Sequence, residues 1–367
     1  MLEDQYTLDF IAKKTGKKPH CNSELYRIEE HLFIPVCSLL LGYHGAGKSM
    51  TLQLIQFCYS LFEGKILFRP EDFSEEEISI ELFFFDQGKL YHYTCEILPP
   101  KKTKVFFENY CIFKNQTLHF KYVEKFQEKR FWKGRWNVLH TKISPHPTDY
   151  SLLAFFHFQK PAMRMVKHYS KEELFQRFNE CIPYLSSDTA SILYELFHLP
   201  FHQLEAIGED RYLVHYSNAK LEVEKSQLNK LFTSGTMYGI LLYAYTLFAL
   251  EEGALLVIDE SEINIHSELM IHILHLFLNK EANRYGATLI LSTFHHYLID
   301  VFQRFDFIHI LTKNDEGRVS IHPLLHYFTN RIRTRGSKLF YLSHLGIVPD
   351  YVKLNEILRN IVSKIYV

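Results

Sequence analysis

The feature that most constrains the fold is an eight-residue glycine-rich segment, Gly42-Tyr-His-Gly-Ala-Gly-Lys-Ser49. It fits the pattern G-x-x-x-x-G-K-[ST] at every defined position. A short apolar run, residues 36–41, leads into it, and a helical pattern continues from it to Leu61. Because this kind of loop joins a buried strand to the start of a helix, the segment predicts a strand–loop–helix unit in an α/β fold.

The same segment predicts binding of ATP and Mg²⁺. Its glycines let backbone N–H groups point inward around a β-phosphate, while Lys48 supplies a positive charge to the β and γ oxygens. The Ser49 hydroxyl is the expected Mg²⁺ ligand. The candidate nucleotide-binding residues in this part of the chain are Gly42, His44, Gly45, Ala46, Gly47, Lys48, Ser49 and Met50.

A second apolar run, residues 255–258, ends in the acidic pair Asp259-Glu260. A carboxylate at the end of a buried strand can hold Mg²⁺ through water, so Asp259 joins Ser49 as a candidate metal ligand. Glu260 is expected to be the general base that orients the attacking water, which makes Lys48 and Glu260 candidate catalytic residues. Apolar strands that end in Asp-Glu are common, and this one gains its meaning from the glycine-rich segment.

The rest of the chain alternates between strand and helix patterns. Two alternating runs, residues 78–85 and 90–97, flank a turn that contains Gly88, and they predict a hairpin. The other expected elements are strands within 104–142, helices within 149–199, strands near 212–221, a helix at 236–250, a strand at 254–258, a helix at 267–284 and a strand at 287–291. The strand–helix–strand order of the last third predicts parallel pairing.

Composition and charge exclude several classes of protein. The formal net charge of −1 implies no global attraction to nucleic acid or to acidic membranes. The six cysteines form no CxxC pair, which argues against a zinc ribbon and predicts buried free thiols in a reducing compartment. The most apolar stretch, residues 240–250, is too short to span a bilayer, and the first residues show no signal-peptide pattern. We therefore expect a cytoplasmic protein without a membrane partner.

Four motifs together resemble those of the ABC-class ATPases grouped as OLD-like or SMC-like AAA proteins, which are frequent in bacterial anti-phage and abortive-infection operons. The segments that carry the resemblance are GYHGAGKS at 42–49, TSGT at 233–236, LLVIDESEINIH at 255–266 and STFHHYLID at 292–300. The resemblance implies ATP-driven dimerisation of head domains. It also implies cytoplasmic action, often beside a separate effector protein such as a nuclease or a toxin.

The implied fold class is α/β, a P-loop NTPase of ABC ATPase type, with a mixed sheet, an antiparallel β portion and a helical insertion. The expected divisions are 1–142 as the first part of the ATPase head, 143–225 as a mainly helical insertion, 226–310 as the second part of the head and 311–367 as a C-terminal extension.

The resemblance also implies roles for smaller features. Ser234 and Gly235 match the signature loop, which reaches across a homodimer, or a higher homo-oligomer, to the γ-phosphate bound by the other protomer. Residues 262–266 match the stretch where the dimer interface usually passes. His295 is the candidate switch histidine and the third candidate catalytic residue. The plainer alternatives are that Ser234-Gly235 belongs to a helix N-cap and that His295 is an ordinary polar residue.

The chain departs from the family pattern in two places. Strict alignment puts Phe294 where the family has its switch histidine, so either His295 serves after a one-residue shift, or the switch is lost and hydrolysis is slow. No glutamine is clearly the Q-loop residue: Gln87 lies in the expected hairpin turn, which leaves Gln116 as a speculative candidate.

The sequence shows no pattern for two larger features that related proteins carry. The 67 residues after Asp300 are too few for a TOPRIM nuclease domain, and no heptad arm is present, so we expect another protein to supply any effector activity. Two alternatives stay open: an ATP-stabilised scaffold that restrains a toxin or nuclease with little turnover, and an SMC-type head for DNA repair.

Nucleic acid is an alternative partner on compositional grounds. Residues 114–142 contain eight Lys or Arg against two Glu, interleaved with aromatic residues, which is typical of a nucleic-acid groove. The alternative is a twisted sheet with aromatic core faces and solvated lysines. A second basic cluster comprises Arg331, Arg333, Arg335 and Lys338.

Overall fold

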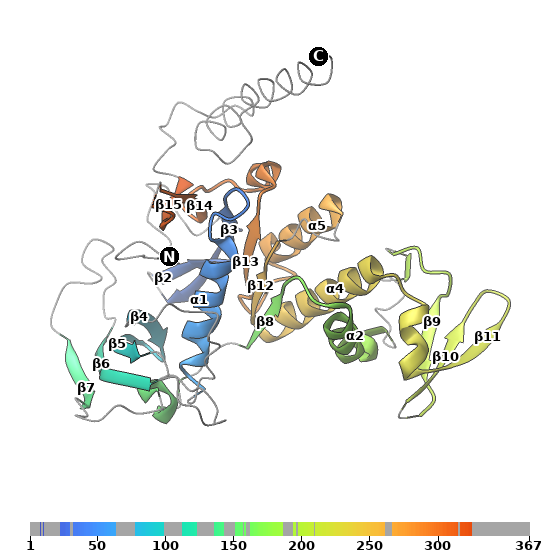
Figure 1. Cartoon of the computed structure of the whole chain (residues 1–367), viewed down its shortest axis with the longest axis horizontal. Coiled ribbons are helices and arrows are strands. Elements are labelled where there is room, and N and C mark those ends of the chain that lie inside the picture. The colour runs from blue at the N-terminus through green and yellow to red at the C-terminus, as the bar shows by residue number, and fades with distance from the viewer. Residues whose placement is uncertain are drawn as a thin grey trace, which may run out of the picture.

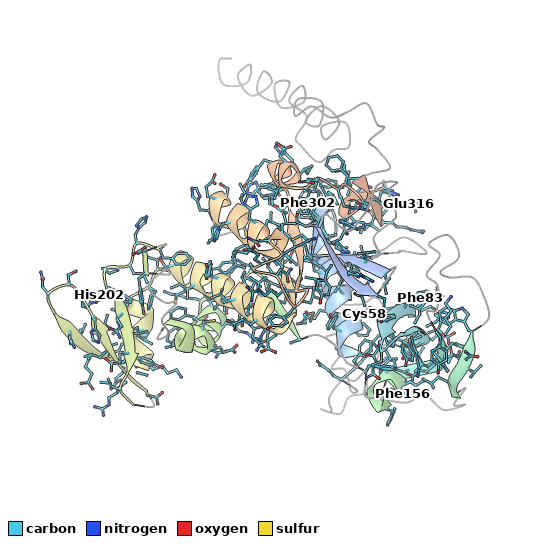
Figure 2. The ribbon with its side chains drawn as sticks, turned by 180° about the vertical axis from the view of Figure 1, so that it is seen from behind. Cys58, Phe83, Phe156, His202, Phe302 and Glu316 are labelled. Atoms are coloured by element: carbon cyan, nitrogen blue, oxygen red, sulfur yellow. The ribbon has the colours of Figure 1, made fainter. Side chains whose placement is uncertain are left out.

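The structure is a computed structural model that describes residues 8, 10, 23–29, 32–63, 78–98, 112–122, 136–142, 151–156, 158, 162–185, 194–195, 197–208, 210–260, 266–314 and 316–324. A central sheet lies in the middle of an elongated molecule, with a four-stranded sheet at one end and a three-stranded sheet at the other (Figure 1). From behind, Phe83 and Phe156 mark the four-stranded end, Phe302 the centre and His202 the three-stranded end (Figure 2).

The central sheet has six strands in the order β15-β14-β3-β13-β12-β8. Its strands are β3 (Cys37–Leu41), β8 (Met163–Val166), β12 (Leu255–Ile258), β13 (Thr288–Thr293), β14 (Ile308–Lys313) and β15 (Val319–Pro323). All neighbouring pairs are parallel except β14 and β15. The expected parallel pairing of the strands in the last third is confirmed, since β12 lies beside β13 with Leu256 opposite Leu289. The chain is thus a mixed α/β protein with a mostly parallel main sheet.

Helices cover both faces of the central sheet, which explains why its strands are apolar on both sides. Helix α1 (Lys48–Ser60) lies on one face, and helices α4 (Ser234–Glu252) and α5 (Ser267–Leu278) lie on the other (Figure 1). Leu40, Val257 and Ile290 pack with α1, whereas their sequence neighbours face α4 and α5. Each fully buried Leu or Ile contributes about 1.5–3 kcal/mol relative to an exposed position.

Helix α4 is buried on nearly every side because it lies between the sheet and helix α2 (Lys171–Leu185). It ends at Gly253, which adopts the left-handed conformation and donates its N–H to the Ala249 carbonyl. A Cβ at this position would lie 2.6 Å from the Tyr285 carbonyl oxygen, so only glycine allows this close turn into β12.

The four-stranded sheet is an antiparallel meander of β4 (Ile78–Asp86), β5 (Lys89–Leu98), β6 (Ile112–Tyr122) and β7 (Asn137–Lys142). The expected hairpin is confirmed: Gln87 and Gly88 both have positive φ, as a tight two-residue turn requires. One sheet face packs on the 3₁₀ helix η3 (Leu152–Phe155) and on the end of α1, where Phe62 meets Phe84 edge to face. Cys58 marks this end of α1 in Figure 2.

Three smaller units complete the described part of the chain. Strands β1 (Leu25–Glu29) and β2 (Leu32–Pro35) form an antiparallel pair that leads into β3. Strands β9 (Gln203–Ala206), β10 (Arg211–His215) and β11 (Lys220–Glu224) form the three-stranded sheet, which the 3₁₀ helix η4 (Lys225–Lys230) connects to α4. The 3₁₀ helix η5 (His296–Val301) follows β13.

Three expectations need correction. The helical pattern expected over 149–199 holds for α2 but fails for β8, a four-residue strand of the central sheet. The strands expected near 212–221 are present as β10 and β11, within the region 143–225. The helix expected to reach residue 284 ends at Leu278, because the Asn279 side chain accepts hydrogen bonds from the N–H groups of Glu281 and Ala282 and turns the chain. The boundary expected after residue 310 falls inside β14, so the central sheet extends to β15.

None of the helices in the described part of the chain combines the length and hydrophobicity that a membrane crossing needs. The four described cysteines, Cys37, Cys58, Cys95 and Cys181, form no disulfide bond, as expected. Burial raises the pKa of both Cys58 and Cys181 to about 12. Cys21 and Cys111 lie outside the described residues.

Alkylation of Cys181 tests whether α2 is packed as described. Because the thiolate is the reactive form and burial raises the pKa of Cys181, this thiol stays neutral at about pH 8 and reacts slowly in the folded protein. We expect peptide mass spectrometry to show Cys181 modified by iodoacetamide at least about tenfold faster in guanidinium than in buffer. Equal rates in the two solvents would contradict the described packing of α2.

Candidate functional site

The glycine loop, residues 42–47, connects β3 to α1 as predicted. Gly45 and Gly47 have φ values of 79° and 95°, a left-handed region that favours glycine. The β14–β15 hairpin packs tightly on the loop: a Cβ at Gly42 would lie 2.9 Å from the Leu311 carbonyl oxygen. A Cβ at Gly47 would lie 2.7 Å from a methyl group of Val319. The first and last residues of the loop must therefore be glycine, because Leu311 and Val319 leave no room for a Cβ.

The start of α1 is suited to an anion. Its N-cap, Gly47, has no side chain to accept the first N–H groups, and its first turn contains no acidic residue. The N–H groups of Lys48, Ser49 and Met50 belong to this first turn, which has no preceding helical carbonyls to receive them. The partial positive charge at the N-terminus of this 13-residue helix therefore faces the loop.

Lys48 is folded over the glycine loop. Its side chain is only 5% exposed, and Nζ donates hydrogen bonds to the carbonyl oxygens of Gly42 at 2.8 Å and Tyr43 at 3.1 Å. These contacts hold an ammonium group directly above the loop. Ser49 and Met50 are half-buried, Ala46 is buried and His44 is exposed.

Asp259 follows β12 and lies on the α1 face of the sheet. Side chains alternate along a strand, and Val257 packs with α1, so Asp259 is directed to the same face. Asp259 is 8% exposed, and its carboxylate accepts a hydrogen bond from the Ser292 hydroxyl at 2.5 Å. The pairing register explains this contact: Ile258 lies opposite Leu291, so the next residue on each strand is Asp259 and Ser292.

Glu260 has an unusual backbone conformation. Its φ of 50° lies in the left-handed region, which is uncommon for a residue other than glycine. Its N–H donates to the Ser292 hydroxyl oxygen at 2.9 Å, and its side chain is half-buried. The chain therefore turns sharply at the end of β12, and this turn determines where the Glu260 carboxylate points.

The central sheet brings the two principal motifs to one edge. Strand β13 lies between β3 and β12, and all three run parallel, so Gly42, Phe294 and Asp259 each follow the carboxyl end of a strand. Ser49 belongs to α1, and Asp259, which follows β12, is directed to the same face of the sheet as α1. A hydroxyl and a carboxylate are oxygen ligands of the kind that Mg²⁺ prefers, so the donor set fits this metal. Among the described residues, no group of three or more His, Cys, Asp or Glu side chains is arranged to hold a metal.

The residues after β13 show an aromatic contact with the glycine loop. The Phe294 ring lies 4.9 Å from the His44 ring, whereas the His295 ring meets Phe294 edge to face and is tilted against Tyr297. His295 precedes η5, and its N–H donates to the Thr293 hydroxyl at 3.0 Å. The side chain next to the loop is therefore Phe294.

The structure does not bring Ser234 and Gly235 to the glycine loop of the same chain. Both residues begin α4 on the side of the three-stranded sheet, and α4 ends beside β12 (Figure 1). Thr233 is the N-cap, and its hydroxyl accepts the Thr236 N–H at 3.2 Å, so Ser234 and Gly235 are the first two residues of the capped helix.

Other sequence candidates have structural roles or lie outside the described residues. Gln116 is buried in β6, where its carbonyl oxygen accepts hydrogen bonds from the Tyr93 hydroxyl and the Leu152 N–H, both at 2.6 Å. Leu118 and Phe120 of the basic stretch pack in the sheet core, as the twisted-sheet alternative expects. Residues 123–135 and 261–265 and the cluster Arg331, Arg333, Arg335 and Lys338 lie outside the described residues.

The sequence pattern predicts no site contact for Ser292, Leu311 or Val319. The strand pattern identifies β13, but only the pairing register shows that Ser292 reaches Asp259, and no local signal indicates that β14 and β15 enclose the glycine loop. These residues act at the site through long-range pairing, which single-sequence patterns do not contain.

No model of a known protein family matches this chain, and no curated protein matches its sequence. The fold and the site define a class by themselves: a mixed α/β protein with a glycine loop and an acidic strand end at one edge of a mostly parallel sheet.

Alanine substitutions at two loop glycines should differ in effect. Gly45→Ala meets no atom within 4 Å, so it should cost only the left-handed strain of about 1–2 kcal/mol. Gly47→Ala adds the clash with Val319, and we expect a total of about 2–4 kcal/mol. Urea denaturation of the two variants measures the difference. If Gly47→Ala is as stable as Gly45→Ala, β15 does not press on the loop as described.

Proposed function

We propose that this protein is a Mg²⁺-dependent, ATP-binding and ATP-hydrolysing protein of the ABC type, with 42–49 as its P-loop. The observation that carries the proposal is the glycine loop with its buried lysine and uncapped helix start, at the same sheet edge as Asp259. Phosphate groups suit such a site because helix N-termini and ammonium groups both favour negative charge.

Each residue has a distinct task in this proposal. The N–H groups at the start of α1 hold the β-phosphate, and the Lys48 ammonium exchanges the carbonyls of Gly42 and Tyr43 for the β and γ oxygens. Ser49 would hold Mg²⁺ directly and Asp259 would hold it through water. The bound metal supplies charge neutralisation on the phosphate oxygens. Glu260 orients the attacking water and accepts its proton.

The location of Ser234 and Gly235 supports a composite site. They lie at the start of α4, which is on the side of the three-stranded sheet and away from the glycine loop of the same chain (Figure 1). In the ABC arrangement the same residues face the nucleotide of another protomer. We therefore propose a homodimer, or a higher homo-oligomer, that closes around ATP.

The biological setting rests on the resemblance of the four motifs alone. We propose a cytoplasmic sensor or motor of a bacterial anti-phage system, which acts with a separate effector protein such as a nuclease or a toxin. The gene beside this one is the simplest place to look for that partner.

A second candidate function is an ATP-stabilised scaffold with little turnover. The observation that favours it is Phe294, whose ring lies against His44 of the glycine loop. A phenyl ring neither donates a hydrogen bond to a γ-phosphate nor accepts a proton, so a site with this residue in the switch position would bind ATP and hydrolyse it slowly.

Replacing Lys48 tests the binding claim. Lys48→Ala removes the buried ammonium, and we expect affinity for a fluorescent ATP analogue with Mg²⁺ to fall by at least about tenfold, since one charge-assisted hydrogen bond contributes roughly 1.5–3 kcal/mol. Lys220→Ala, an exposed position on β11, is the matched control and should bind as the wild type does. Equal affinity in the Lys48 variant and the control would refute the proposed site.

Replacing Glu260 tests the hydrolysis claim. Glu260→Gln keeps the side-chain shape and removes the general base, so ATP should remain bound and hold two protomers together. Size-exclusion chromatography with ATP and Mg²⁺ should show a dimer that the wild type forms only transiently. Unchanged ATP turnover in this variant would falsify the role of Glu260, and tight ATP binding with near-zero wild-type turnover would favour the scaffold.

A further inference from the structure

The Ser292 side chain bonds to both halves of the acidic pair. Ser292 is the fifth residue of β13 and is fully buried. Its hydroxyl donates to Asp259 Oδ1 at 2.5 Å and accepts the Glu260 N–H at 2.9 Å. A serine hydroxyl has one proton and two lone pairs, so both contacts can be made at once.

The two bonds have consequences for both acidic residues. The bond to Asp259 fixes the rotation of a buried carboxylate, and an oxygen of that carboxylate then faces a constant direction. The bond to the Glu260 N–H supports a left-handed backbone that a glutamate rarely adopts. A strained backbone conformation persists only where surrounding contacts hold it in place, and such conformations are concentrated at functional sites.

Another buried hydroxyl of the chain serves as a comparison. Thr246 in α4 is also fully buried, and its hydroxyl donates to the Leu242 carbonyl one turn earlier in the same helix. That bond satisfies the hydroxyl locally and involves no candidate site residue. Ser292 is satisfied instead by two site residues that follow a different strand.

We infer that Ser292 is a positioning residue, which orients Asp259 toward the metal-bound water and sets the direction of the Glu260 side chain. The inference rests on the proposed function, because it gives Ser292 a task only if Asp259 and Glu260 act on Mg²⁺ and the attacking water. Ser292 itself does not touch the nucleotide, so its effect passes through the two acidic residues.

Loss of the Ser292 hydroxyl should impair Mg²⁺ binding or ATP hydrolysis and leave ATP binding nearly unchanged. In Ser292→Ala the Asp259 carboxylate loses its donor and the Glu260 N–H loses its acceptor, while the glycine loop and Lys48 keep their contacts. Residues that support metal ligands typically change metal affinity or activity about 10–100-fold when replaced. We therefore expect the half-saturating Mg²⁺ concentration to rise, or turnover to fall, by that factor, with little change in ATP affinity measured in EDTA.

A double-mutant cycle distinguishes positioning from general stabilisation. Ser292→Ala is made in the wild type and in Asp259→Asn, with Mg²⁺-dependent ATP binding and turnover as readouts and Thr246→Val as the off-site control. If Ser292 acts through Asp259, its replacement changes little more once Asp259 is gone. Ser292→Cys, which weakens the donor and keeps a side chain of similar shape, replaces the alanine variant if that one does not fold.

Three outcomes are decisive. A shifted Mg²⁺ requirement or turnover that is non-additive with Asp259→Asn supports the inference. Unchanged Mg²⁺ dependence and turnover, fully additive effects, or a loss equal to that of Thr246→Val overturns it while leaving the proposed function intact. Absence of ATP binding in the wild type overturns the proposed function and removes the basis of the inference with it.

Discussion

The parallel pairing of β3, β13 and β12 is the constraint on which the rest of the site depends. Parallel strands end at one edge of their sheet, so three segments that are far apart in sequence leave the core side by side. The glycine loop leaves β3, the Phe294 segment leaves β13 and the acidic pair leaves β12. Because helices cover both faces, that edge is where polar side chains can lie at the end of apolar strands.

Burial gives this arrangement its electrostatic character. The ammonium of Lys48 and the carboxylate of Asp259 are both nearly inaccessible to water, and burying a charge is unfavourable unless polar groups surround it. Here carbonyl oxygens of the loop surround the lysine and the Ser292 hydroxyl bonds to the aspartate. Incoming phosphate would replace the loop carbonyls around Lys48, whereas the Ser292 bond to Asp259 would remain and hold the carboxylate in place.

Much of the fold was predictable from local pattern. The apolar run before Gly42, the turn at Gly88 and the alternation of strands and helices in the last third predicted β3, the β4–β5 hairpin and the β12–β13 pair. Strand β8 was missed because four residues on a sheet edge carry no period, and the extent of the sheet to β15 was missed because pairing with β14 is decided by tertiary contacts. For the site, motif spacing identified the loop and the acidic pair, whereas Ser292 required the register between strands.

The central claim is that the start of α1 and the end of β12 together hold the phosphates of ATP with Mg²⁺. Amide hydrogen exchange, monitored by mass spectrometry with and without a non-hydrolysable ATP analogue and Mg²⁺, tests it directly. The account predicts that the analogue slows exchange in peptides that cover residues 42–50 and 259–260. Protection confined to other parts of the chain, or no protection at saturating analogue, would contradict it.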